Sequence, residues 1–492
     1  MRIRACLRFV SVLAGTVAAP IAAVAEERTE RFDRDSGWDA SNNRSNAFAP
    51  RKITQDFGFS RTHHAGGESA GEIGGVVTPA AEPAYYAKVI PTATFGDKLV
   101  ASGKLAYRTG PGHLLIGFFH AGTLNEWRTP NTIALRILGR GERFFAFAEY
   151  MTSHWRAGGD NPGGLPTVID PQSGKPELVG FEAKGKVHEW SLTYDPEGNN
   201  GAGSITLLID GQTCICHLDP GHKQDGATFN RFGVLPVMKQ WDDPGEIWLD
   251  DVTVNGRKED FSADPGWEGR DNRRTYVSGN VRPRFDFGYS RTHFAGGESS
   301  GELGGLVFSG DIRVPHRTAY YGDKLETLSL ARPLRASGRI ALRRAVSDSA
   351  VLLGFFDSQE SARSQRPPST SWTQAVPRNF LGFSVEGPSS KGFLVYPVFR
   401  AAGEGRRAYD RGGPHIQPDG SGHRWTIEYE PREGKSGVVR LRFDGKATPE
   451  LEVPLDEQGS ARFDRFGIIS TWVDGNGQLI YFDDLEYTCR QE

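Results

Sequence analysis

Short apolar and alternating stretches recur along the chain, and they predict β-strands. Leu114–Phe119 and Val351–Phe356 are unbroken apolar runs with one internal glycine each, as buried strands have. Trp190–Tyr194 and Trp425–Tyr429 alternate apolar and polar residues instead, which is typical of antiparallel strands with one buried face. Long stretches of Ala, Leu, Glu and Lys at helical spacing are absent from the sequence. The pattern therefore predicts an all-β fold.

Composition supports this fold class and narrows the function. The chain holds 61 Gly and 29 Pro with 11% aromatic residues, which favours many short strands joined by tight turns. The net charge of -3 is spread along the chain without a basic cluster, so we expect no nucleic-acid partner. Cys214, Cys216 and Cys489 are too few for a disulfide framework or a zinc site.

The N-terminal residues predict export. Residues 1–25 begin with arginines, continue with an apolar run rich in Ala and Val, and end with small residues before Glu26, which is the pattern of a cleaved signal peptide. No later apolar run approaches the roughly 18 residues of a membrane-spanning helix. We therefore expect a secreted protein, periplasmic or extracellular, with no membrane span.

One stretch occurs twice and indicates the domain organisation. Phe57–Gly75 and Phe287–Gly305 are identical at all but four positions, at an offset of about 230 residues. This offset suits a duplicated domain and is too long for a solenoid repeat. A Gly-Trp pair and then an Asn-Arg pair precede both copies at matching distances. We therefore predict two tandem domains, residues 26–256 and 257–492.

The two repeats also close alike. Each contains a Trp-x-x-x-Tyr strand, a strand ending in Asp-Gly, a Phe-x-x-Phe-Gly strand and a last strand ending in Asp-Asp. This series resembles the concanavalin A-like (laminin-G-like) jelly rolls of secreted bacterial proteins. The resemblance implies two tandem antiparallel β-sandwich (jelly-roll) domains. Members of that superfamily commonly bind or cleave polysaccharides on a concave sheet face, and the fold alone does not decide between the two.

Polar residues of the shared stretch are the candidates for catalysis. Arg61 and His63 fall on one face of an extended strand. Together with Tyr86 they have the residue types that neutralise a uronate carboxylate and move its α-proton in β-elimination. Alternatively, Glu68 and Glu72 serve as the acid and the nucleophile or base of hydrolysis. The corresponding candidates in the second repeat are Arg291, His293, Glu298, Glu302 and Tyr321.

A structural interpretation of the same stretch stays open. Its many glycines suit bulges, positive φ angles and close sheet packing, and its Arg and Glu side chains can pair with one another. In that case the stretch shapes the sheet and carries no chemistry.

Aromatic side chains give a second group of candidates, because flat rings stack on the apolar faces of sugars. They lie in or beside variable segments of the first repeat, or in the shared stretch where the second repeat has Phe294. These candidate ligand-binding residues are His64, Trp127, His154, Trp155 and Trp241.

The last strand of each repeat ends in two aspartates. Asp251 and Asp484, together with an acidic residue near each domain's start, have the hard oxygen ligands that calcium prefers. The sequence therefore allows a structural calcium ion at these aspartates. We expect no cofactor to be required for catalysis.

These features predict a secreted protein that acts on a polysaccharide or oligosaccharide, as a lyase or a glycosidase. Two alternatives stay open. One is a non-catalytic carbohydrate-binding or adhesion protein, in which the repeats supply avidity. The other is a structural envelope protein. The sequence does not indicate which oligomeric state the protein has.

Overall fold

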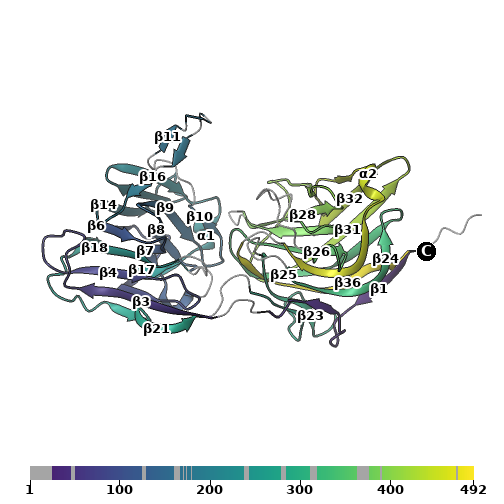
Figure 1. The fold of residues 1–492 in the computed structure, drawn as a ribbon, viewed down its shortest axis with the longest axis horizontal. Helices are drawn as coiled ribbons and strands as arrows, with labels where there is room; N and C mark the ends of the chain where they lie inside the picture. The colour runs from purple at the N-terminus through teal and green to yellow at the C-terminus, as the bar shows by residue number, and fades with distance from the viewer. Residues whose placement is uncertain are drawn as a thin grey trace, which may run out of the picture.

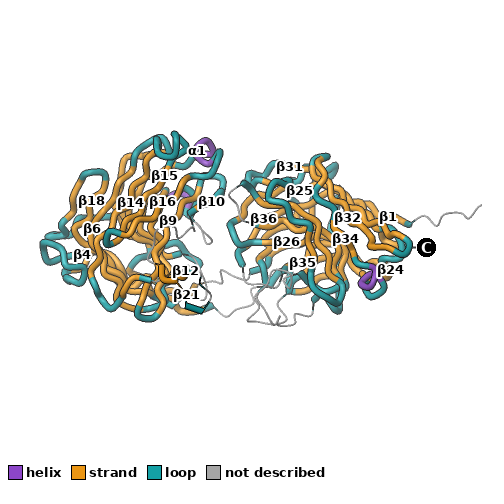
Figure 2. The backbone as a smooth tube through the Cα atoms, turned by 90° about the horizontal axis from the view of Figure 1, so that it is seen from above, coloured by secondary structure: helices purple, strands orange, loops and turns teal. Residues whose placement is uncertain are grey.

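The computed structural model consists almost entirely of β-strands, arranged in two bodies (Figures 1 and 2). It describes residues 25–45, 50–124, 129–159, 167–169, 171–172, 174, 176–178, 180–237, 243–278, 284–310, 318–362, 376–387, 391–471 and 475–491. The predicted signal peptide therefore lies outside the described residues, except for Ala25. Each body is a sandwich of two antiparallel sheets, which confirms the predicted fold class.

The N-terminal sandwich has a nine-stranded sheet, here sheet A, and an eight-stranded sheet, sheet B. In sheet A the order is β16 (Gln212–His217), β15 (Ser204–Ile209), β14 (Val187–Asp195), β6 (Leu99–Thr109), β18 (Gly245–Val254), β4 (Glu72–Val77), β3 (Arg51–Ser60) and β21 (Arg273–Ser278), with β19 (Arg257–Glu259) beside β18. In sheet B it is β10 (Ala157–Gly158), β9 (Arg143–Met151), β8 (Thr132–Arg140), β7 (His113–Phe119), β17 (Thr228–Pro236), β5 (Tyr85–Thr94) and β20 (Glu268–Arg270), with β13 (Phe181–Glu182) beside β9.

The C-terminal sandwich repeats this plan. Its sheet A has the order β22 (Asp286–Ser290), β23 (Glu302–Phe308), β36 (Gly477–Arg490), β25 (Leu334–Ala345), β31 (Gly422–Arg432), β32 (Lys435–Phe443) and β33 (Lys446–Ala447), with β1 (Glu26–Glu30) beside β36 and β34 (Leu451–Val453) beside β32. Its sheet B has the order β2 (Asp39–Ser41), β24 (Tyr320–Ser329), β35 (Arg462–Ser470), β26 (Ala350–Phe356), β27 (Phe380–Glu386), β28 (Phe393–Arg400) and β29 (Arg406–Arg407), with β30 (His415–Ile416) beside β28.

A few small elements complete the described residues. They are the hairpin of β11 (Thr167–Ile169) and β12 (Pro176–Leu178), the 3-10 turn Ala121–Thr123, and the one-turn helices α1 (His222–Asp225) and α2 (Leu455–Gln458). Among the described residues, no helix has the length and apolar character needed to cross a membrane.

Burial explains why the two sheets have different sequence patterns. β7 is buried along its whole length, because a second apolar cluster covers the face of sheet B that points away from the core. An unbroken apolar run is therefore the pattern that this strand needs. β14 alternates between buried and exposed positions, because the outer face of sheet A meets solvent. The outer face of sheet A is thus the polar and accessible face.

The opening segments of the two repeats are exchanged between the sandwiches. We call residues 25–45 the first arm and residues 257–278 the second arm. The first arm pairs β1 with β36 and β2 with β24, both in the C-terminal sandwich, and Figure 1 shows the purple β1 beside the yellow β36. The second arm pairs β20 with β5 and β21 with β3, in the N-terminal sandwich. Each sandwich therefore contains the opening segment of the other repeat.

Both arms insert the same residues into equivalent slots. Phe32 and Trp38 of the first arm belong to the core of the C-terminal sandwich, whereas Phe261 and Trp267 of the second arm belong to the core of the N-terminal one. The predicted division at residues 256 and 257 assigns each arm to the repeat that follows it, and the strand pairing corrects this assignment. The physical reason is that the repeated Phe and Trp pattern suits either slot equally well.

Candidate functional site

The shared stretch forms a loop that follows β3 or β22 and ends where β4 or β23 begins. Glu72 is fully buried, and its carboxylate accepts hydrogen bonds from the backbone N–H groups of His64 and Ala65, both at 2.7 Å. Glu302 does the same in the second repeat, with Phe294 N at 2.9 Å and Ala295 N at 2.7 Å. Both carboxylates are therefore engaged in holding the loop closed, as buried acceptors usually are.

This loop crosses the outer face of sheet A. Ala65 packs in an apolar cluster with Ala106 of β6 and Trp248 of β18. The ring of His64 lies 5.0 Å from that of Trp248, and in the other sandwich the ring of Phe294 lies 4.8 Å from that of Tyr481. The structure thus places the candidate ligand residue His64 against the sheet, where the second repeat has an apolar ring.

A bulge in the last strand of each repeat, β18 or β36, directs two aspartates at the loop. Asp251 and Asp484 have φ angles of 49° and 47°, in the left-handed region where bulges place a residue. The adjacent Asp250 is buried, and its carboxylate accepts a hydrogen bond from Gly67 N at 3.0 Å. Burial raises the pKa of Asp250 to about 6. A Cβ atom at Gly67 would lie 2.1 Å from this carboxylate, so only glycine fits there.

The calcium prediction does not match the contacts of Asp251. Lys104 Nζ lies 3.0 Å from Asp251 Oδ2, and Lys258 Nζ lies 3.5 Å from Oδ1. Within the part of the chain that the structure describes, no three His, Cys, Asp or Glu residues are grouped so that they can hold a metal ion. The donor set around Asp251 therefore favours an ion pair with lysine, and calcium at Asp251 and Asp484 stays a prediction.

One groove lies over the strands β6 and β14 of the N-terminal sandwich. Its counterpart lies over β25 and β31 of the C-terminal sandwich, where Gly297 and Glu298 of the second loop line it as well. The N-terminal groove, of about 310 Å³, is lined by Ser102, Gly103, Lys104, Glu189, Trp190, Ser191, Leu208, Asp210, Gly211 and Asp251. The C-terminal groove, of about 390 Å³, is lined by Thr29, Arg31, Gly297, Glu298, Ser337, Gly338, Arg339, Arg424, Trp425, Thr426, Asp484 and Glu486.

The two grooves are built from equivalent positions. Strand register pairs Gly103 with Trp190 in one sandwich and Gly338 with Trp425 in the other. Because glycine has no side chain, Gly103 and Gly338 do not cover the neighbouring strand. The floor of each groove therefore extends to the strand that carries the tryptophan. A Cβ at Gly338 would lie 3.1 Å from the Trp425 ring. Serine, glycine, tryptophan and aspartate thus recur at the same places in both grooves.

The other candidate catalytic residues are not brought together. Arg61 and His63 are exposed, and the structure gives their side chains no partner within its described part; Arg291 and His293 are alike. Glu68 pairs with Lys258 at 2.8 Å, and Glu298 pairs with Arg31 of the first arm at 2.8 Å.

Tyr86 and Tyr321 lie elsewhere, in the sandwich cores beneath the arms. The Tyr86 ring stacks on Trp267 at 5.9 Å, and its hydroxyl lies 3.4 Å from Asp264. The Tyr321 ring stacks on Trp38 at 5.8 Å. The predicted set of arginine, histidine, glutamate and tyrosine is therefore not assembled into one site in either sandwich.

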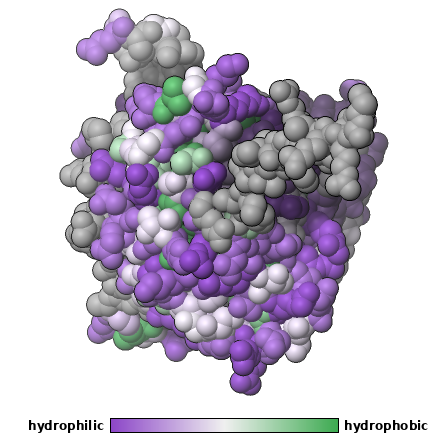
Figure 3. Space-filling model, turned by 90° about the vertical axis from the view of Figure 1, so that its right-hand side faces the viewer, coloured by the Kyte–Doolittle hydropathy of each residue, from purple (hydrophilic) through white to green (hydrophobic). Residues whose placement is uncertain are grey.

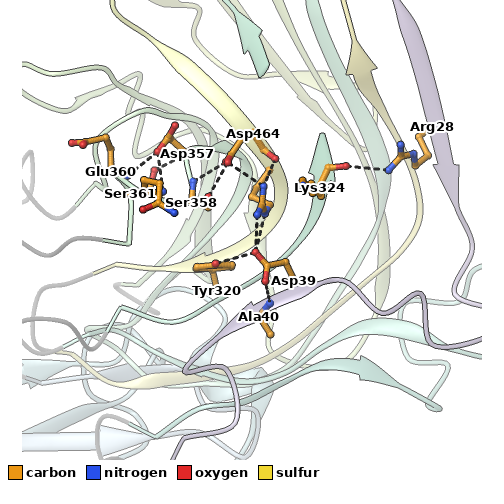
Figure 4. Close-up of polar contacts among 12 residues, drawn as sticks. Arg28, Asp39, Ala40, Tyr320, Lys324, Asp357, Ser358, Glu360, Ser361 and Asp464 are labelled. Atoms are coloured by element: carbon orange, nitrogen blue, oxygen red, sulfur yellow. Dashed lines mark hydrogen bonds and ion pairs between the residues drawn. The ribbon is translucent and has the colours of Figure 1, made fainter. Parts of the chain in front are cut away.

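The neighbouring tyrosines form a contact that sequence analysis missed. Tyr320 and Arg465 both donate to Asp39 Oδ2, the tyrosine at 3.1 Å and Arg465 Nη2 at 2.8 Å. Figure 4 shows Asp39 of the first arm beside Tyr320. In the N-terminal sandwich Tyr85 and Arg231 contact Glu268 of the second arm in the same way.

These contacts tie each arm to sheet B, and in the N-terminal sandwich they shift the pKa values of the tyrosine and the carboxylate. Burial and the nearby carboxylate raise the pKa of Tyr85 to about 12, so the hydroxyl keeps its proton. The hydrogen bond from Tyr85 lowers the pKa of Glu268. The residues of this contact lie in three motifs that both repeats share: Tyr-Tyr, Gly-Trp-Asp/Glu and Phe-x-Arg-Phe-Gly. The sequence therefore contained a sign of the contact, but only the exchange of the arms brings the three motifs together.

The predicted aromatic ligand residues are scattered. Trp127 and Trp241 lie outside the described residues. His154 Nδ1 is 2.9 Å from Asp225 Oδ1 at the edge of helix α1. Trp155 packs against the core cluster of the C-terminal sandwich, and the guanidinium of Arg344 lies 5.6 Å from its ring. Trp155 therefore joins the two sandwiches.

A buried charged cluster is present in the N-terminal sandwich. On the covered face of sheet B, Arg136 Nε lies 3.0 Å from Glu149 Oε2, and Arg136 Nη1 lies 3.2 Å from His113 Nε2. The register of the C-terminal sandwich places Ser384 and Val398 where Arg136 and Glu149 stand. The cluster therefore belongs to one repeat alone.

No family model matches the chain, and no curated protein matches it in sequence. Among solved structures, domains LG4-5 of the mouse laminin alpha1 chain are 12% identical, with 89% of this chain and 91% of that chain covered and a TM-score of 0.22. An endo-β-1,4-glucuronan lyase from the fungus Trichoderma reesei is 14% identical over 48% of this chain and 97% of that one, with a TM-score of 0.27. The alginate lyase Aly36B is 8% identical over 39% and 83%, with a TM-score of 0.26.

Likeness at these identities and TM-scores carries no argument about activity. The sheets themselves show a tandem pair of antiparallel β-sandwiches, which is the fold that the resemblance of the closing strands implied.

Proposed function

We propose that this protein binds glycans at two sites, one in each groove on the outer face of sheet A. The observation that carries the proposal is the duplication of the grooves: Ser102, Gly103, Trp190 and Asp251 have identical counterparts in the C-terminal groove. The second loop lines the C-terminal groove through Gly297 and Glu298, whereas the first loop reaches the N-terminal groove only through the contact of Glu68 N with Asp251.

The chemistry of the linings suits sugars. Both grooves combine hydroxyl groups with carboxylates and cationic side chains, which donate to and accept from sugar hydroxyls. Their volumes of about 310 and 390 Å³ fall in the range of small-ligand sites. The resemblance to concanavalin A-like jelly rolls raises the expectation of a carbohydrate ligand by fold-level analogy. Export through residues 1–25 is part of this proposal and places the protein where polysaccharides occur.

The experiment is a binding titration with groove-filling variants. Ser191→Trp and Thr426→Trp put a large ring on the floor of the N-terminal and C-terminal groove, respectively. Thr193→Trp and Glu428→Trp are the matched controls, because they lie two residues further along the same strands, on the same face and outside the linings. The purified protein is titrated calorimetrically with a soluble polyuronate and with a neutral β-glucan.

Each groove variant is expected to abolish one of two binding sites, and the double variant to abolish both, while the controls bind as the wild type does. If the folded double variant binds like the wild type, the grooves are not the sites. If neither the wild type nor the variants bind any glycan of a wider panel, glycan binding itself is refuted.

A lyase or glycosidase activity is the second candidate, and the cluster of Arg136, His113 and Glu149 favours it. An arginine beside a histidine has the residue types that β-elimination uses, and confinement to one repeat is expected when one copy of a duplicated site has decayed. The assay follows new reducing ends and the absorbance of unsaturated uronates, with His113→Gln and His63→Ala compared. Loss of products in folded His113→Gln alone supports catalysis at the cluster of Arg136, His113 and Glu149. Loss of products in His63→Ala alone indicates that catalysis takes place at the exposed loop instead.

A further inference from the structure

We propose that the C-terminal groove recognises an anionic group of its glycan, a carboxylate or a sulfate, through Arg424 and Arg339, and that the N-terminal groove does not. This inference rests on the proposed function, and it assigns different ligands to two sites that otherwise match. The observation behind it is a reversal of charge at one position of the groove floor: Arg424 in the C-terminal sandwich stands where the N-terminal sandwich has Glu189.

Strand register makes this reversal significant. Arg424 of β31 is directly opposite Arg339 of β25. Like charges directly opposite each other in an antiparallel pair destabilise the sheet. In the N-terminal sandwich the corresponding pair is Glu189 and Lys104, which attract each other. The C-terminal sandwich thus has an unfavourable pair at a position where the N-terminal sandwich has a favourable one.

The other charges of the C-terminal groove leave Arg424 available. Arg339 Nε lies 3.4 Å from Asp484, and Arg31 Nε lies 2.8 Å from Glu298. The side chain of Arg424 is exposed and has no ion pair or hydrogen bond with any residue that the structure describes. Glu486, the remaining carboxylate of the lining, lies on β36, from which β25 separates the strand of Arg424.

The exchanged first arm adds a further difference in charge between the two grooves. Thr29 and Arg31 of the first arm line the C-terminal groove, so three arginines and three carboxylates surround it. The N-terminal groove has no lining residue from an arm, and its charged residues are Lys104 against Glu189, Asp210 and Asp251. An anion therefore meets repulsion in the N-terminal groove and an unpaired guanidinium in the C-terminal one.

A guanidinium suits an oxyanion for a geometric reason. Its planar fork donates two parallel N–H bonds to a carboxylate or sulfate. A bound anion also relieves the repulsion between Arg424 and Arg339, because it lies between two positive charges. Neutral sugars gain neither effect, although they can still use the hydroxyl groups of Ser337 and Thr426.

The test exchanges the two charges. Arg424→Glu and Glu189→Arg are made singly in the full chain, and Arg432→Glu is the matched control, since it makes the same change of charge on β31 outside the groove. Arg424→Lys keeps the charge without the fork. Titrations use a soluble polyuronate, a neutral β-glucan and a sulfated form of that β-glucan, at low and at high salt.

We expect Arg424→Glu to weaken binding of the anionic polymer at the C-terminal groove at least tenfold, to weaken binding of the neutral glucan much less, and to reduce the salt dependence. Arg424→Lys should recover part of the loss. Glu189→Arg should give the N-terminal groove affinity for the anionic polymer. A preference for the polyuronate assigns a carboxylate, and a preference for the sulfated glucan assigns a sulfate.

The failure of this inference is distinct from the failure of the proposed function. If Arg424→Glu and Arg432→Glu bind all three polymers as the wild type does, while Thr426→Trp abolishes binding at the C-terminal groove, that groove is a glycan site without anion selectivity. If the wild type binds none of the three polymers, the anion site is overturned, and if it binds no glycan of the wider panel either, the proposed function is overturned with it.

Discussion

Trp38 offers a direct test of the exchange of the arms, because it belongs to the first repeat in sequence and to the C-terminal sandwich in structure. Its side chain is only 7% exposed and packs in the C-terminal core. Its ring stacks on Tyr321 at 5.8 Å and meets the rings of Phe32 and Tyr487 edge to face. The perturbation is Trp38→Ala, and Trp267→Ala is the matched change in the second arm.

The expected cost follows from the area that the ring buries. A tryptophan removes on the order of 150–250 Å² from water, which at about 25 cal/mol per Å² is worth about 4–6 kcal/mol. Measured Trp→Ala losses in protein cores are about 3–5 kcal/mol. We therefore expect Trp38→Ala to lower the free energy of unfolding of the C-terminal sandwich by about 4 kcal/mol, a large part of what stabilises a typical domain.

The assay is amide hydrogen exchange resolved by peptide, since it reports local stability separately for each sandwich. In Trp38→Ala, peptides from β24 and β36 should exchange up to about a thousandfold faster, because each 1.4 kcal/mol is a factor of ten. Peptides from β5 and β18 should change little. Trp267→Ala should give the mirror result.

The opposite pattern would refute the reasoning. If Trp38→Ala accelerates exchange in β3 and β5 and leaves β24 and β36 protected, the first arm packs on its own repeat and the arms are not exchanged. Equal acceleration in both sandwiches would mean that they unfold as one unit, and thermal unfolding of the two variants should then coincide.

Three further predictions concern the loop, the arm contacts and the cysteines. Glu72→Gln should lower stability by about 1–3 kcal/mol, because an amide NH₂ then faces a backbone N–H, and a thermal melt measures this; a catalytic role for Glu72 instead predicts lost turnover at unchanged stability. The hydrogen bond from Tyr85 lowers the pKa of Glu268, so its contribution is present above the ordinary pKa of 4.5 and is lost as pH falls through the lower folded pKa. The stability difference between wild type and Glu268→Gln is at most about 1 kcal/mol because the side chain is 40% exposed. In an acid denaturation series this difference should shrink as pH falls below 4.5 and vanish below the lowered folded pKa, and a difference that grows on acidification contradicts the contact. The cysteines at 214, 216 and 489 are buried and form no disulfide, and burial raises the pKa of Cys216 to about 12. A disulfide reagent should therefore titrate them only after unfolding, and rapid labelling of the native chain would be inconsistent with this packing.

Much of the fold could be predicted from the sequence, because its signals are local. The apolar run Leu114–Phe119 lies in β7, and the alternating Trp190–Tyr194 lies in β14. The partners of the arms could not be predicted in this way. Trp38 and Trp267 occur in the same pattern, so each suits both slots, and only the three-dimensional arrangement decides between them.

The candidate site was harder to predict, because residue type does not reveal orientation. Glu72 has the type of a catalytic acid, but its carboxylate is directed at two backbone N–H groups. Glu189 and Arg424 occupy the variable position of a His-x-Trp motif that both repeats share. That variation becomes meaningful only when the strand register places each residue opposite Lys104 or Arg339.

The pairing of β1 with β36 has a consequence for how the chain is made. The first strand of the described chain pairs with the last one, so the first arm cannot dock until almost the whole chain has been synthesised and the C-terminal sandwich has begun to form. Contacts of such long sequence separation form late and slowly. Until then Phe32 and Trp38 of this arm are exposed and have no packing partner, which is a stage at which chaperone binding and aggregation compete. A fragment cut at residue 256 would make this stage permanent, since each half would then lack the segment that completes its core.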